Sequence, residues 1–238
     1  MNFFLKIVVL LLFYTGISFA DIQKIKSDVY SSLEKLLGEN FDNTDFSIKS
    51  IEKTKPEIGI KTLKPIFKNE NDITFIQGSL FTHDGDRETL NLGLGKRFLK
   101  DNENLMLGIN AFYDHEFDYN HHRTSIGAEI QSSILELNMN NYFAISGKKI
   151  GRNDNLEEAL DGYDLEVGTH LPFMPTWKFY TKMFEFDVPG GNDFEGYEYS
   201  SEFLVPNSGL TLGVGRTEYT DHQDEWFFKI SYNLNDVD

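Results

Sequence analysis

Apolar and polar residues alternate one by one along most of this chain. The pattern is clearest from Leu105 to Glu129, where two alternating runs flank a polar turn. Ile109 and Ala111 share one face of the first run, while Asn110 and Asp114 share the other. A repeat of two residues is the period of a β-strand. Because the core of a soluble sandwich would not accept the amides and charges of the polar face, the pattern favours a barrel that is apolar outside and polar inside.

Twelve such segments follow residue 44. Most have about ten residues, which is the length a tilted strand needs to cross a bilayer. An even number of strands puts both chain ends on the same side of the membrane. The connections on that side are short, and those on the other side are longer, above all 147–160. The sequence therefore predicts an all-β, twelve-stranded antiparallel transmembrane β-barrel over 45–234, whose last strand pairs with its first. The predicted strands are 45–52, 56–67, 72–82, 89–99, 104–116, 122–132, 135–146, 161–171, 176–187, 194–205, 209–219 and 224–234.

The first 44 residues follow different patterns. Lys6 precedes an unbroken apolar run, and Ser18-Phe19-Ala20 offers the small residues of a signal-peptidase site. We expect residues 1–20 to be a signal peptide cleaved after Ala20, not an uncleaved anchor, since the run is short for a spanning helix. Helical spacing of apolar residues predicts a short amphipathic helix over 21–38, and a linker then completes 21–44. The helix could lie in the periplasm or plug the lumen, and its apolar face favours the periplasm.

Aromatic residues make up 14% of the chain, and many fall near predicted strand ends. Amphipathic rings are stable at the depth of lipid headgroups, so two aromatic girdles are expected. Ordinary enrichment of aromatics in strands is the alternative, but the agreement with loop lengths favours the girdles. The expected girdle residues are Tyr113, Phe143, Tyr163, Tyr197 and Trp226 near the outer ends, and Trp177 and Tyr232 near the inner ends.

Charged residues of both signs fall on the polar faces of the predicted strands. They can pair across the bore, and we expect a self-satisfied network that stiffens the barrel rather than a selective conduction path. If ions pass, the acidic excess predicts cation preference. Glycines on the same faces are expected to leave room for bulky side chains opposite. The charged residues are Arg97, Asp114, Arg123, Glu129, Glu136, Asp164, Glu166, Glu198, Glu202 and Lys229, and the glycines are Gly93, Gly95, Gly108, Gly127, Gly168, Gly213 and Gly215.

Composition excludes several function classes. A net charge of −16 argues against nucleic-acid binding, and the absence of cysteine excludes disulfides and thiolate metal sites. We expect no cofactor, no metal site and no enzyme activity. A carboxylate–histidine pair at the outer rim could activate water for hydrolysis. The sequence spacing does not show a nucleophile, a base and a third group that orients the base, so we prefer a solvated acidic rim or weak divalent-cation binding. The rim residues are His83, Asp84, Asp86, Asp114, His115, Asp118, His121 and His122.

Several ordered motifs resemble the β-barrel domain of inverse autotransporters, the family of intimin and invasin. They are Gln77-Gly78-Ser79, Leu90–Arg97, Gly108–Asp114, Arg123–Glu129, Asp161–Asp164 and Leu171-Pro172. The resemblance implies a twelve-stranded barrel in the outer membrane of a Gram-negative cell, surrounded by lipid and inserted by the barrel-assembly machinery. Family adhesins continue into extracellular domains. Because this chain stops at Asp238, we expect a short form without a passenger.

The sequence thus predicts a monomeric outer-membrane barrel with a structural or pore-like role. One alternative is a small adhesin that binds an unknown surface ligand through loops 117–121, 147–160 and 188–193. The rim hydrolase is a second alternative. A soluble, lipocalin-like barrel is the rival fold, and it would purify without detergent.

Overall fold

The computed structural model describes residues 43–234 apart from 53, 84–86 and 101–103. The predicted signal peptide and N-terminal helix lie outside the described residues. The barrel strands are β1 (Thr44–Ile51), β2 (Glu57–Lys68), β3 (Asp72–His83), β4 (Arg87–Lys100), β5 (Leu105–Glu116), β6 (His121–Ser132), β7 (Leu135–Ala144), β10 (Gly162–Leu171), β11 (Met174–Phe186), β12 (Phe194–Val205), β13 (Leu210–Tyr219) and β14 (Glu225–Asn233).

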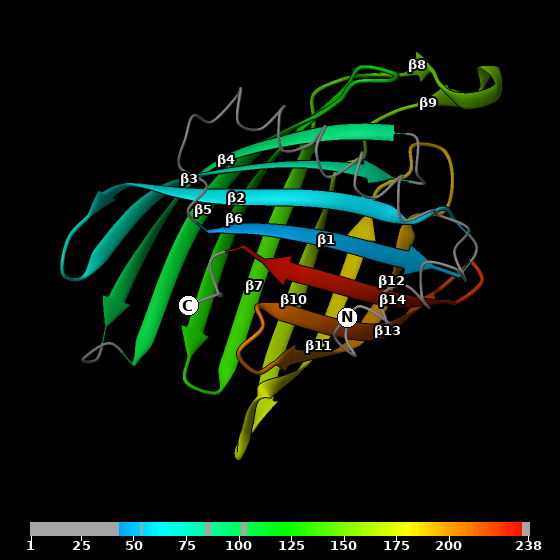
Figure 1. Cartoon of the computed structure of the whole chain (residues 1–238). Coiled ribbons are helices and arrows are strands. Elements are labelled where there is room, and N and C mark those ends of the chain that lie inside the picture. Colours follow the sequence, from blue (N-terminus) through cyan, green and yellow to red (C-terminus); the bar gives the residue numbers. More distant parts are fainter. Residues whose placement is uncertain (1–42, 53, 84–86, 101–103, 235–238) are drawn as a thin grey trace. The chain divides into compact units, whose positions relative to one another are not determined.

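These strands form one closed antiparallel barrel. Each barrel strand pairs with the barrel strands that precede and follow it in the sequence, and the first strand, β1, also pairs with the last, β14. β1 pairs with β14 from Asp45↔Asn233 to Ile51↔Phe227, so the blue and red strands of Figure 1 lie side by side. The predicted closure of the last strand on the first is confirmed. Closure removes the unpaired edges that an open sheet would expose.

All twelve predicted barrel strands are found, and no boundary differs by more than two residues. The sequence did not predict the small hairpin of β8 (Lys149–Ile150) and β9 (Leu156–Glu157), joined by the 3-10 turn η1 (Arg152–Asp154). Two-residue strands are too short for a period of two to be recognised. This hairpin occupies the connection that was expected to be the longest loop.

The barrel has two unlike ends. We call the end where β1 begins and β14 ends the terminal end, and the opposite end the loop end. The connections at the terminal end include the short turns 133–134 and 172–173, whereas 145–161 and 187–193 lie at the loop end. The β8–β9 hairpin stands beyond the barrel strands at the upper right of Figure 1. The predicted difference between short turns at one end and longer loops at the other is therefore present.

The outer wall of the barrel is apolar and exposed. Alternate residues from β3 round to β14 present large hydrophobic side chains on this face, as the period of two requires. Among the described residues, no helix is long and apolar enough to cross a membrane. The exposed wall residues include Ile76, Leu92, Leu94, Ile109, Ile126, Ile130, Met139, Val167, Phe179 and Val214.

The inner wall alternates large side chains with glycine, as the sequence predicted. Phe112 covers Gly93, Phe75 covers Gly95, and a Cβ at either glycine would lie 2.0–2.3 Å from the ring. The partners lie directly opposite each other on neighbouring strands. Glycine is needed at these positions because two side chains cannot occupy the same inward space.

Candidate functional site

A belt of polar residues runs around the lumen at one level of the strand register. Its members face one another directly on successive strands, so their side chains share the inner face. The belt passes from β4 through β5, β6, β7, β10, β11, β12 and β13 to β14. Its members are Arg97, Gly108, Glu129, Asn138, Glu166, Lys182, Glu198, Thr217 and Glu225.

The best-defined ion pair in this belt joins Arg97 and Glu129, which lie on strands separated by β5. Arg97 donates from Nε to Oε1 at 2.7 Å and from Nη2 to Oε2 at 3.1 Å. Gly108 lies between them in register, and a Cβ there would be 2.2 Å from Glu129 Oε1. The guanidinium also lies 4.8 Å from the centroid of Phe75. A two-point charged hydrogen bond of this kind fixes both side chains.

The same arrangement of acid, glycine and base occurs again on β12, β13 and β14. Glu202, Gly213 and Lys229 are in register, and Lys229 Nζ lies 2.8 Å from Glu202 Oε1. Charged partners two strands apart can meet because the strand between them carries no side chain at that point. These inward charges are therefore held as pairs along the lumen wall, not as isolated charges.

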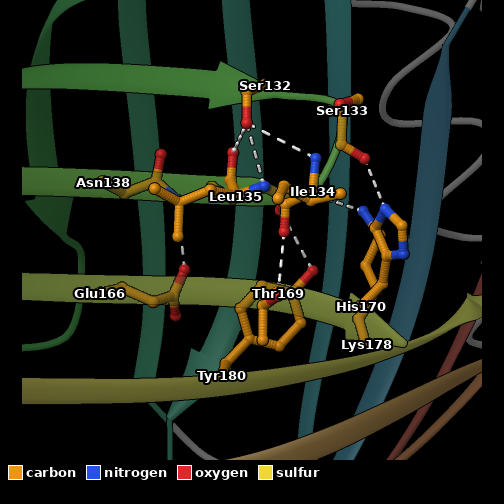
Figure 2. A network of polar contacts seen from close by, with 11 residues as sticks. Ser132, Ser133, Ile134, Leu135, Asn138, Glu166, Thr169, His170, Lys178 and Tyr180 are labelled. Carbon is orange, nitrogen blue, oxygen red and sulfur yellow. Dashed lines mark hydrogen bonds and ion pairs between the residues drawn. The ribbon is translucent and has the colours of Figure 1, made fainter. Parts of the chain in front are cut away.

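A related cluster lies on β7, β10 and β11 near the terminal end (Figure 2). Lys178 is paired with Glu136, and Tyr180 donates to the same carboxylate at 3.2 Å. Asn138 donates to Glu166 at 3.2 Å. Tyr180 lies over Gly168, where an added Cβ would be 2.5 Å from the ring.

Side chains also tie the β6–β7 turn to β10 at this end, as Figure 2 shows. Thr169 donates to the carbonyl of Ile134 at 2.9 Å, and the ring of His170 lies between the carbonyls of Ser133 and Leu171. These contacts connect the β6–β7 turn to β10. The terminal end of the barrel wall is thus braced across three strands.

A second polar row lies closer to the loop end. Asn91 donates to Asp114 Oδ1 at 2.6 Å, and Arg123 donates to Asp114 Oδ2 at 3.0 Å. The Arg123 guanidinium lies 4.3 Å from the centroid of Tyr142, whose hydroxyl donates to Asp164 at 2.7 Å. Each charge in this row has a partner of opposite sign or a hydrogen-bond donor.

The structure thus places all ten predicted lumen charges on the inner face. Each has a hydrogen-bond or ion-pair partner there. The sequence did not identify several of those partners. Lys49 and Lys182 could have been found from strand period alone, whereas Asn91 and the tyrosines carry no distinctive signal. The partners that were missed are Lys49, Lys178, Lys182, Asn91, Tyr142 and Tyr180.

Two cavities lie in the loop-end half of the lumen. The larger has a volume of about 410 Å³ and is lined mainly by β1, β11, β12, β13 and β14. The smaller, of about 320 Å³, is lined by β3 to β6 and by Ala159 and Leu160 of the long loop. Both volumes are in the range of small-molecule sites.

The long loop is fastened to the barrel by an ion pair. Arg87 on β4 donates to Glu157 Oε2 at 2.6 Å, and the Arg152 N–H donates to Oε1 at 3.0 Å. Burial alone would raise the pKa of Glu157, but these hydrogen bonds outweigh it and hold that pKa below its usual value. We call this contact the latch. It keeps part of the loop over the smaller cavity.

The predicted girdle residues lie on the outer face of the wall. Trp177 is stacked on Phe179 at 5.8 Å, and its indole donates to Ser201 at 2.6 Å. Tyr197 is stacked on Tyr199. Toward the loop end the outer face carries Tyr113, Phe143, Tyr163, Tyr197 and Trp226, and toward the terminal end Trp177 and Tyr232. Their depth in a membrane stays a prediction.

Three of the rim histidines, His83, His121 and His122, line the smaller cavity together with Asp114. His115 and His122 contact each other at 3.0 Å on the outer face. His83 lies 2.7 Å from Glu57, and His121 contacts Ser146 at 3.4 Å. Asp84 and Asp86 lie outside the described residues. The contacts of the described residues do not join a nucleophile, a histidine and a carboxylate in series, as a rim hydrolase would require.

Acidic groups also gather beside the β11–β12 loop. Glu185, Asp187 and Asp193 each place a carboxylate oxygen within 4.8 Å of the others. Exposed carboxylates often lie this close without an ion. The expected absence of a metal site is not tested by this arrangement.

The family model of the inverse autotransporter β-domain matches residues 18–235. The chain belongs to the inverse autotransporter β-domain family. A putative attaching and effacing protein homolog of Escherichia coli K12 is 32% identical over 133 residues, or 55% of this chain and 42% of that protein. Invasin of Yersinia enterocolitica is 27% identical over 209 residues, or 83% of this chain and 24% of invasin. Intimin of Citrobacter freundii is 35% identical over 116 residues, or 48% of this chain and 12% of intimin.

The chain therefore spans less than half the length of these curated relatives. Among solved structures, one from "Unveiling the Mechanism Behind the in-meso Crystallization of Membrane Proteins" has a TM-score of 0.71 at 20% identity, over 82% of this chain and 85% of that one. Outer membrane phospholipase A of Escherichia coli has a TM-score of 0.51 at 10% identity, over 81% and 92%. At such low identity these likenesses concern the fold alone. The resemblance of the motifs to inverse autotransporters is confirmed.

Proposed function

We propose that this inverse autotransporter β-domain is an outer-membrane barrel whose role is structural: it anchors the chain in the membrane and surrounds a constricted polar lumen. The observation that carries the proposal is the contrast between the two faces of one wall. Outward residues such as Ile109 and Ile126 are large, apolar and exposed, whereas inward residues such as Arg97 and Glu129 are charged and paired. Lipid outside and a polar interior inside explain both faces.

The two ends give the proposal an orientation. Short turns at the periplasmic side and longer outer loops are typical of bacterial outer-membrane barrels. We therefore assign the terminal end to the periplasm and the loop end to the cell exterior. The proposal includes a signal peptide over 1–20, a short helix and linker over 21–44, insertion by the barrel-assembly machinery and a monomeric barrel over 45–234.

Membrane fractionation tests this proposal together with gel migration before and after boiling. A closed outer-membrane barrel fractionates with that membrane and changes mobility when heat unfolds it. A protein that is soluble without detergent, with an unshifted band, would contradict the proposal.

Two lysine substitutions on β6 test which face meets lipid. Ile126→Lys puts a charge on the outer face and is expected to destabilise the barrel by about 2–4 kcal/mol near the bilayer midplane. Gln131→Lys, on the exposed inner face of the same strand, is the matched control and should change stability by less than about 0.5 kcal/mol. Denaturant midpoints in lipid vesicles give both values. Equal effects at the two positions would argue for a soluble barrel.

One observation favours surface binding as a second candidate function. Ile150 and Leu156 face each other in the β8–β9 hairpin and are 67% and 69% exposed. An apolar pair at the tip of an outer loop is a suitable contact for a surface ligand. Replacing both with serine should reduce adhesion of whole cells and leave the amount of barrel in the membrane unchanged. Unchanged adhesion would remove this candidate.

A further inference from the structure

The larger cavity in the loop-end half of the lumen has a wall of aromatic rings. We call it the aromatic chamber. Its volume is about 410 Å³. Four members of the polar belt also line it, namely Lys182, Glu198, Thr217 and Glu225. The rings that line it are Phe184 and Phe186 of β11, Phe194 of β12, Tyr219 of β13 and Phe227 of β14.

Four of these rings form a continuous surface. Phe184 lies 5.6 Å from Phe194 and 6.3 Å from Phe186, and Phe194 lies 5.2 Å from Tyr219, all between centroids. The interplanar angles of 34–41° in these pairs are tilted, not parallel. Neighbouring rings inclined in this way can present their faces toward one enclosed point, which is the geometry of an aromatic cage.

Carboxylates accompany the rings in the chamber wall. Glu57, Glu198 and Glu225 line it together with Lys49 and Lys182. The two lysines are engaged by carboxylates, since Lys49 pairs with Glu198 at 3.2 Å and Lys182 with Asp164 at 3.9 Å. With histidine neutral, the acids lining the chamber outnumber its bases. A ring surface with excess carboxylate favours a cationic guest over an anionic one.

Lys49 shows how an ammonium group is held in this chamber. Its Nζ lies 4.0 Å from the centroid of Phe227 while it is paired with Glu198. The Phe227 ring also covers Gly215, where an added Cβ would be 2.3 Å away. One internal cation, the Lys49 ammonium, therefore already lies against Phe227. A second, the Arg123 guanidinium, lies 5.8 Å from the centroid of Phe186. Phe184, Phe194 and Tyr219 have no such partner among the cation–ring contacts of the described residues.

We propose that the aromatic chamber binds a small organic cation with a substituted ammonium head, which enters from the loop end. The positive head would lie against the faces of Phe184, Phe194 and Tyr219, close to the carboxylates of the wall. A cation over aromatic faces is attracted by their quadrupoles, most strongly where water is excluded. The chamber volume suits a ligand of this size. Binding does not require passage through the polar belt, so this proposal stands apart from the question of conduction.

Calorimetric titration of the folded, detergent-solubilised full chain tests the proposal with choline as the probe. The neutral isostere 3,3-dimethylbutan-1-ol has the same shape without the charge and serves as the ligand control. The detergent should be a polyoxyethylene, because phosphocholine headgroups would compete. We expect choline to bind at least tenfold more tightly than the isostere. Equal binding of both, or preference for a neutral sugar such as glucose, would overturn the proposal.

Three variants locate the site. Phe194→Leu should weaken choline binding roughly tenfold, because it removes one ring face. Phe179→Leu, on the outer face of β11, is the matched control and should leave binding unchanged. Lys49→Met should strengthen binding several-fold, because it frees Phe227 and Glu198 from the internal ammonium. Gain of affinity cannot result from partial unfolding, so weaker or unchanged binding in this variant would contradict the site. Heat-dependent gel mobility verifies that each variant is folded.

Discussion

The two halves of the lumen are built differently on the same strands. Toward the terminal end, charged side chains meet across glycines, as Arg97 and Glu129 do over Gly108. Toward the loop end, aromatic rings and the polar row around Asp114 surround two cavities. The strand pattern and register are continuous through both halves. The choice of inward residues alone therefore decides whether nearby strands are joined by ion pairs along the inner wall or leave open space there.

The difference separates two tasks. Ion pairs that bridge two strands constrain the wall, because each partner is held by a neighbour that is itself fixed. Tilted rings along the wall of a cavity can present their faces to a guest. We infer that the terminal half maintains the shape of the barrel and that the loop-end half faces outside molecules. The predictions below test this division, from the largest expected effect to the smallest.

Breaking the pair at the terminal half should have the largest effect on stability. Arg97→Leu leaves the Glu129 carboxylate, only 12% exposed, without its partner. We expect a loss of about 2–3 kcal/mol, less than for a fully buried pair because the lumen admits water. Denaturant unfolding in vesicles, followed by gel mobility, measures it.

The control for this variant is a more exposed pair in the same barrel. Lys61 and Asp45 are 52% and 36% exposed, so Lys61→Met should cost less than about 0.5 kcal/mol. The double variant Arg97→Leu with Glu129→Leu should regain part of the lost stability. Equal losses for Arg97→Leu and Lys61→Met would show that the belt does not constrain the wall.

Adding one methyl group between the charges should have an intermediate effect. Gly108→Ala places a Cβ 2.2 Å from Glu129 Oε1, so the carboxylate must move away from Arg97. We expect a loss of about 1–2 kcal/mol. Gly78→Ala on β3 is the matched control, since its nearest neighbour would be Leu92 at 3.7 Å. Thermal midpoints of the heat-dependent mobility shift compare the two. A stabilised Gly108→Ala protein would be the opposite of the expected result.

Release of the latch at the loop end should be the smallest effect on stability. The pKa of Glu157 is below its usual value. The stabilisation that Glu157 gives the latch is therefore complete at pH values above the usual pKa of a glutamate, and it is lost as the pH falls through the lowered pKa. Acidification should therefore speed proteolysis of the loop 145–161 while the barrel stays folded. Glu157→Gln should make cleavage fast at all pH values, and Arg87→Gln should do the same. A cleavage rate independent of pH in the unaltered protein would show that the latch does not hold the loop.

The sequence predicted the barrel far better than the contacts inside it. A period of two specifies both strand and face, so the strands and the inward charges could be found from residues such as Ile109 and Asp114 alone. The partner of Arg97 depends on register and on the glycine between, which no local pattern reveals. Lys49 was not among the predicted lumen charges, yet it is inward and paired with Glu198, two strands beyond β14. That contact exists only because the barrel closes.

The β8–β9 hairpin and the aromatic chamber were missed for different reasons. Two-residue strands show no period, and the latch joins Arg87 to Glu157 across 70 positions of sequence. The chamber rings come from β11 to β14, where alternating aromatics are also typical of lipid-facing walls. Trp226 was predicted on the outer face, but only the closed register shows that Phe194 and Phe227 line one cavity on the inner face.

Single-channel recording in planar bilayers tests the central claim most directly. It would compare the protein with a variant in which Arg97, Glu129, Glu202 and Lys229 are all alanine. We expect the unaltered barrel to insert with low, cation-preferring conductance, and removal of the two ion pairs to increase the conductance several-fold. A large conductance in the unaltered protein, unchanged by the four substitutions, would contradict a lumen constricted by paired charges.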